Sequence, residues 1–156
     1  PGTWGRALMP DTVEQQAIDT FKARLDTITG ATVYQNRSKP VPDAGLPAIE
    51  MVVVGSEGAD FGATGVEAHS LNILVACYAK KTPTRSAAQV NGDLRGAVRQ
   101  AIGADPTLGG LVVDINETDT DIDINEIDGA PESGGSLIAF SVLYWTRPGD
   151  PYTVGP

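Results

Sequence analysis

Residues 111–145 read LVVDINETDTDIDINEIDGAPESGGSLIAFSVLYW, and this stretch carries the clearest strand pattern in the chain. From Asp119 to Ile124, aspartates occupy the odd positions and Thr or Ile the even ones. Successive side chains of a strand point to opposite faces. The pattern therefore predicts a strand with carboxylates on one face and Thr/Ile on the other. A Gly/Pro/Ser break at 129–135 separates it from an apolar run, 137–145, so we expect two neighbouring strands joined by a flexible connection.

The spacing of Asp119, Asp121 and Asp123 superficially matches the start of a calcium loop, D-x-D-x-D. An EF-hand also needs glycine at its sixth position and glutamate at its twelfth. Those positions hold Ile124 and Ala130, so the match fails. Three interpretations stay open: a solvated face or charged edge strand that prevents edge-to-edge pairing, a surface that stays near DNA without binding it, and a weak surface site for a divalent ion.

The C-terminal third carries nearly all of the formal net charge of −9. Residues 1–110 hold ten Lys/Arg against eleven Asp/Glu, whereas residues 111–156 hold one against nine. A surface of that sign repels nucleic acid.

The single cysteine, Cys77, excludes an internal disulfide and is expected to be a buried, inert thiol. With the single histidine, His69, it cannot supply the four ligands of a structural zinc site.

The rest of the chain predicts one soluble α+β domain with two helices. The first helix has about 17 residues after a cap at Asp11 or Thr12. The second follows a cap at Thr84 or Ser86 and is rich in alanine. Strands are expected at 31–36, 48–56, 66–79 and in the two halves of 111–145.

The domain is expected to span 11–147, with an irregular arm at 1–10 and an extended tail at 148–156. The glycine-rich segment 57–65 predicts a mobile loop or hairpin tip. These three segments and two arginines are candidates for contacts with a neighbouring subunit. For Trp4 we favour docking on its own domain over a subunit contact, and for the two arginines we favour solvated exposure. The interface candidates are Trp4, Phe61, Arg95, Arg99, Trp145 and Tyr152.

The sequence holds no catalytic signature. It contains no G-x-S-x-G, no HExxH, no Cys–His set and neither glycine-rich phosphate-binding motif. We therefore expect no enzyme activity, no metal and no cofactor. No apolar run is long enough to span a membrane. The first residues lack the charged start and apolar core of a signal peptide, which predicts a cytoplasmic origin.

Five segments carry a more specific signal: FKARLDTITGATVYQNR, LPAIEMVV, LNILVACYAK, DPTLGGLVVDI and FSVLYWTRPGDPY. Together they resemble the tail-terminator proteins of long-tailed phages and phage-like particles, also called minor tail protein U or tail completion proteins. The likeness covers residues 11–147.

The resemblance implies a mixed, mainly antiparallel sheet of about five strands with two helices packed on it. It also implies a virion protein, assembled in the host cytoplasm, that forms a ring of typically six subunits on the head-proximal end of the tail. Such a ring stops the tail-tube protein from polymerising, joins the tube to head-completion or connector proteins, and lets DNA pass.

No functional residue carries over by position from this family. In physical terms, the column Asp119, Asp121 and Asp123 fits a channel lining, because like charge lowers sticking during DNA transit. The alternatives are another head–tail joining or tail-tube protein and, from a different class, a small-ligand-binding α+β domain.

Overall fold

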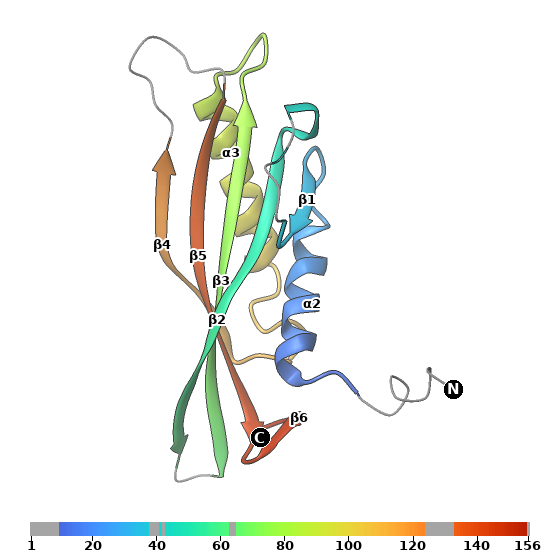
Figure 1. Ribbon diagram of the computed structural model, residues 1–156, viewed down its shortest axis with the longest axis vertical. Helices are drawn as coiled ribbons and strands as arrows, with labels where there is room; N and C mark the ends of the chain where they lie inside the picture. Colours follow the sequence, from blue (N-terminus) through green and yellow to red (C-terminus); the bar gives the residue numbers. More distant parts are fainter. Residues whose placement is uncertain (1–9, 38–40, 42, 63–64, 124–132, 156) are drawn as a thin grey trace, which may run out of the picture.

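The computed structural model describes residues 10–37, 41, 43–62, 65–123 and 133–155. Over these residues the chain is an α+β domain, as predicted: α2 (Val13–Leu25) and α3 (Ala87–Gly103) lie against one mixed sheet (Figure 1). The strands are β1 (Thr32–Gln35), β2 (Ala48–Gly62), β3 (Val66–Lys80), β4 (Asp114–Asp123), β5 (Ser133–Arg147) and β6 (Asp150–Val154), with a 3-10 turn, η1, at Asp43–Gly45.

The sheet has the order β1-β2-β3-β5-β4, and β6 pairs with the end of β5. Only β1 and β2 run parallel; the other described pairs are antiparallel. The centre is the long β3–β5 ladder, whose register runs from Glu67 opposite Thr146 to Lys80 opposite Ser133. The two halves of the opening stretch, β4 and β5, are neighbours as predicted.

Both helices cover the same face of the sheet. On α2, Phe21 packs edge-on against Phe140 of β5, with ring centroids 5.6 Å apart. On α3, Asn91 reaches the backbone of β3 at Cys77. The alternate positions of β3 that face the helices are buried, as the apolar alternation of the sequence predicts. They are Leu71, Ile73, Val75, Cys77 and Ala79.

The helix starts follow the predicted capping chemistry. Thr12 caps α2 by accepting a hydrogen bond from the Gln15 amide at 3.0 Å. Ser86 caps α3 in a capping box with Gln89. The predicted length of α2 is wrong, because its 13 residues end at Leu25. The Thr27 hydroxyl donates to the Arg24 carbonyl at 2.6 Å, which closes the last turn early.

A buried amide ties α3 to the two central strands. Asn91 is fully buried, and its Nδ2 donates to the carbonyls of Cys77 at 2.9 Å and Gly134 at 3.3 Å. Its Oδ1 accepts from the Ser136 hydroxyl at 2.6 Å and from the Arg95 guanidinium. Every polar atom of this side chain is thus used, which fixes the position of α3 on the sheet.

Three segments differ from the sequence-based expectation. The predicted loop 57–65 is largely strand, because β2 extends to Gly62 and β3 begins at Val66, so only the hairpin tip is left between them. The predicted tail 148–156 turns at Gly149, with φ 71°, and returns as β6 along β5. Residues 111–113 form a turn before β4 rather than its start. The predicted arm lies almost wholly outside the described residues.

Replacing Asn91 with alanine should lower the free energy of unfolding by about 2–4 kcal/mol, because the Ser136 hydroxyl and two strand carbonyls lose their partner in the core. Urea unfolding followed by circular dichroism measures this. Asn116→Ala, an exposed asparagine on β4, is the matched control and should stay within about 0.5 kcal/mol of the wild type. Equal losses for the two variants would contradict the structural role of Asn91.

Candidate functional site

The face of the sheet opposite the helices, here called the open face, is covered by neither of the described helices (Figure 1). Strand register assigns its residues. Ala76 of β3 lies opposite Glu50 of β2 and Leu137 of β5, and Leu137 lies opposite Asp121 of β4. Tyr34 of β1 lies beside Glu50 and completes this row. One transverse row of the open face thus carries a carboxylate on each side of an apolar centre.

A β-bulge at Thr118 brings the acidic residues of β4 into one column. The register passes from Glu117 opposite Phe140 directly to Asp119 opposite Ala139, so Thr118 has no partner. Asp114 and Asp119 therefore share the open face although one number is even and the other odd. The acidic column of β4 comprises Asp114, Asp119 and Asp121, all exposed, and Asp123 continues its register opposite Gly135.

The same bulge leaves Glu117 on the helix side of the sheet, where Arg99 of α3 holds it. The guanidinium donates from Nη2 to Oε1 at 2.7 Å and from Nε to Oε2 at 2.9 Å, a bidentate pair. Arg99 also reaches the Thr120 hydroxyl at 3.2 Å. These bonds hold the pKa of Glu117 below its ordinary value of 4.5 and raise the pKa of Arg99. Arg99 thus connects α3 to the edge strand across the bulge.

The apolar centre of the open face is hollowed around Ala76. Ala76, Tyr78, Asp121, Gly135, Ser136 and Leu137 line a depression of about 190 Å³, here called the trough. Its floor is low because Ala76 is small and Gly135 has no side chain; a Cβ there would meet the Tyr78 ring at 3.5 Å. Leu137 is 41% exposed at its wall. Burial, and secondarily the Glu50 carboxylate, raise the pKa of Tyr78.

Cys77 is buried, as the strand alternation predicts. Its thiol is buried in the core beside Ser136, and burial raises its pKa to about 11, so it stays protonated at neutral pH. His69 stacks on Tyr144, with centroids 4.9 Å apart, and lies 3.2 Å from the Thr146 hydroxyl. Among the described residues, no group of three or more His, Cys, Asp and Glu side chains could hold a metal ion.

The structure brings some of the sequence candidates together and separates others. Asp119 and Asp121 share the acidic column, and Trp145 lies half-buried on the open face of β5 opposite Ala68. Arg95 bonds Asn91 within the chain. Arg99 is engaged with Glu117, as described above.

Tyr152 and Phe61 lie near the ends of the described strands. Tyr152 is 44% exposed on β6. The backbone of Phe61 lies in β2 opposite Glu67, near the hairpin tip. Trp4 and the side chains of Phe61 and Asp123 lie outside what the structure describes.

The trough and the Glu50–Asp121 row could not be found from sequence, because they join four strands that are far apart in the chain. The short side chains at Ala76 and Gly135 were the only local trace of the hollow. The described helices include none long and apolar enough to cross a membrane.

Comparison with known proteins finds likeness among solved structures alone. No family model matches the chain, and no curated protein matches it. Among solved structures, the chain is similar to a chain of the virion of a native gene transfer agent particle, with a TM-score of 0.40 and 13% identity over 86% of this chain and 92% of the other. At that level the function must be argued from the surface of this chain itself.

The Arg99–Glu117 pair should contribute stability that depends on pH. Because the folded-state pKa of Glu117 is depressed, the contribution is present above the ordinary value of 4.5 and is lost as pH falls through the lower folded value. Glu117→Gln should therefore lower the free energy of unfolding by roughly 0.5 kcal/mol at pH 7. The effect is small because both partners of the ion pair are partly exposed to solvent.

That difference should shrink towards zero as the pH falls below the folded-state pKa of Glu117. Urea midpoints measured across the range test it, with Glu57→Gln, an exposed glutamate on β2, as the matched control. A difference that persists unchanged in acid would show that the pair is not its source.

Proposed function

We propose that this chain is a structural virion protein of a phage or phage-like particle, and specifically a tail terminator. In this proposal its copies form a ring, expected to be hexameric, that caps the tail tube and joins it to head-completion proteins. DNA passes through the ring. The sequence resemblance over residues 11–147 supports the family, and the fold class agrees with what that resemblance implies.

The observation that carries the proposal is the open face. A sheet with helices on only one side leaves half-buried apolar residues uncovered on the other, and such surfaces are typical of protein–protein contacts. They include Leu74, Leu137, Leu143 and Trp145. Along its edge runs the acidic column of β4, which repels a nucleic-acid backbone. The open face thus has an apolar surface suited to protein contact, and it is edged by an acidic strand that repels DNA.

A ring needs two different patches on each subunit, because cyclic closure uses heterologous contacts. The helix-covered side and the open face of this domain are such a pair, since they differ in shape and in charge. Packing one subunit's open face against the next subunit's helix side would leave the sheet edges, including β4, along the inner or outer wall. We assign β4 to the inner wall.

The alternative of a small-ligand domain must be weighed against three depressions besides the trough. The smallest of the three measures about 230 Å³ and lies where α2 begins, beside His69 and Tyr144. The turn 81–86 lines one of about 610 Å³, and the facing ends of α2 and α3 line one of about 310 Å³. Sites for drug-sized ligands and cofactors usually measure about 300–1,000 Å³. The two depressions of that size have no His, Cys, Asp or Glu in their described lining, so we favour assembly over ligand binding. Another head–tail joining or tail-tube protein stays the nearer alternative.

Removing the gene from the producing cell should give tail tubes of uncontrolled length that carry no heads, because nothing ends their polymerisation. Electron microscopy of lysates measures tube length and head attachment, and a plasmid copy of the wild-type gene should restore both. Tubes of normal length that lack heads would instead favour a head-completion protein. Normal, joined particles would reject the proposal.

The channel position of the acidic column has its own test. Asp119→Lys places one cation per subunit in the column, so a ring of about six would hold the DNA phosphates. Particle numbers should stay normal while DNA delivery falls at least about tenfold. Asp105→Lys, in the turn after α3, makes the same charge change elsewhere and should deliver DNA normally. Equal delivery by the two variants would place β4 on the outer wall.

A further inference from the structure

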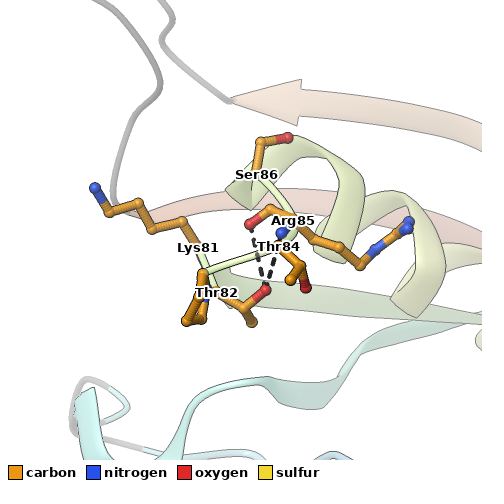
Figure 2. Close-up of a pocket in the computed structure, with 6 residues that line it drawn as sticks. Lys81, Thr82, Thr84, Arg85 and Ser86 are labelled. Carbon is orange, nitrogen blue, oxygen red and sulfur yellow. Dashed lines mark hydrogen bonds between the residues drawn. The ribbon is translucent and has the colours of Figure 1, made fainter.

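The basic turn between β3 and α3, residues 80–86, folds back on itself and lines a shallow depression of about 610 Å³ (Figure 2). The Thr82 amide donates to the Arg85 carbonyl at 2.9 Å, and the Arg85 amide donates to the Thr82 hydroxyl at 3.0 Å. Figure 2 shows Lys81 extending outward from this turn, whereas Arg85 runs back along α3, where it pairs with Asp93 at 2.9 Å. Lys81 is thus the cation that the turn presents to its surroundings.

The turn itself is a poor site for a free anion. An empty helix N-terminus can bind phosphate through its unpaired amides. Here Ser86 and Gln89 form a capping box that already satisfies amides at the start of α3. The Arg85 charge is partly neutralised by Asp93. A protein surface that accepts one projecting lysine fits the turn better.

The trough on the open face has the matching chemistry. Its volume of about 190 Å³ is that of roughly six waters, which suits a single long side chain rather than a cofactor. Ala76, Leu137 and the Tyr78 ring offer an apolar bed for an aliphatic stem. Asp121 stands at one side, and the register places Glu50 on the other, three strands away, at roughly 14 Å.

A lysine meets both requirements, because its methylene stem packs on apolar surface while its ammonium stays at a polar rim. An acidic side chain would be repelled by the carboxylates, and a purely apolar one would leave Asp121 without a partner. The occupant that fits is therefore cationic and amphipathic.

We propose that the trough receives Lys81 from the basic turn of a second copy of this chain. The inference rests on the proposed ring and names its subunit contact. In that contact the stem of Lys81 lies on Ala76 and Leu137, its ammonium pairs with Asp121, and the turn backbone packs over Tyr78.

The positions of the two patches fit a cyclic assembly. The turn leads from the end of β3 to α3 and so lies towards the helix side (Figure 1). The strand register places the trough on the open face. Each subunit can therefore insert its turn into one neighbour and receive the turn of the other. Both patches lie near the same end of β3, since Tyr78 precedes Lys81 by only three residues. If the ring axis runs parallel to the strands, rotation from one subunit to the next does not change the height of the turn or of the trough along that axis. Asp119, one row away, stays available to the channel.

The test is a charge exchange measured by sedimentation velocity over a range of protein concentrations. Asp121→Lys and Lys81→Asp should each weaken self-association at least about tenfold, since each sets like charges against one another. The two variants mixed, or combined in one chain, should recover association. Lys81→Arg should retain it. Higher salt should weaken the wild-type contact.

Asp105→Lys, in the turn after α3, and Arg147→Asp, at the end of β5, are the matched controls and should associate as the wild type does. Urea unfolding verifies that every variant is folded. If all variants form the wild-type oligomer, the subunits join elsewhere; this inference is then wrong while the ring stands. A wild-type chain that stays monomeric at all concentrations rejects the inference, and the tube-length experiment then decides separately on the terminator role.

Discussion

The antiparallel pairing of β3 with β5 is the constraint on which the rest of the domain depends. It joins residues about 70 positions apart and sets the register for every outer strand: β2 pairs with one side of it and β4 with the other. Because side chains alternate along both strands, one register decides which residues face the helices and which face outward. The buried column from Leu71 to Ala79 and the trough at Ala76 are therefore two results of one alignment.

Because both helices pack on the same face of the sheet, the two faces of the domain differ. Asn91 holds α3 to the central strands by bonds that an apolar residue could not make, and Arg99 reaches past the sheet centre to Glu117 on the edge. Both contacts lie on one face, so the opposite face has no cover from its own chain within the described residues. A subunit built in this way is suited to assembly, because its second layer is left for a neighbour to supply.

The sequence predicted the elements well because periodicity depends on local chemistry. The stripes of α2 and α3, the strand alternation around Cys77 and the pairing of β4 with β5 were all anticipated. Helix and strand ends were less accurate: Thr27 closes α2 early by a hydrogen bond to the Arg24 carbonyl, which no propensity indicates. The sequence pattern also did not predict the bulge at Thr118. It therefore did not predict that Asp114 lies in the acidic column. The trough is formed by long-range register, which a local pattern does not contain.

The burial of Cys77 has a practical consequence. It is the chain's single cysteine, and its thiol is both enclosed by the core and held protonated near neutral pH. A thiol-reactive dye added to the folded protein will therefore leave the native chain largely unlabelled. One cysteine introduced at an exposed position away from the basic turn, such as Thr29 after α2, will then be the dominant labelling site. Fluorescence energy transfer between subunits labelled in this way can follow ring closure in real time.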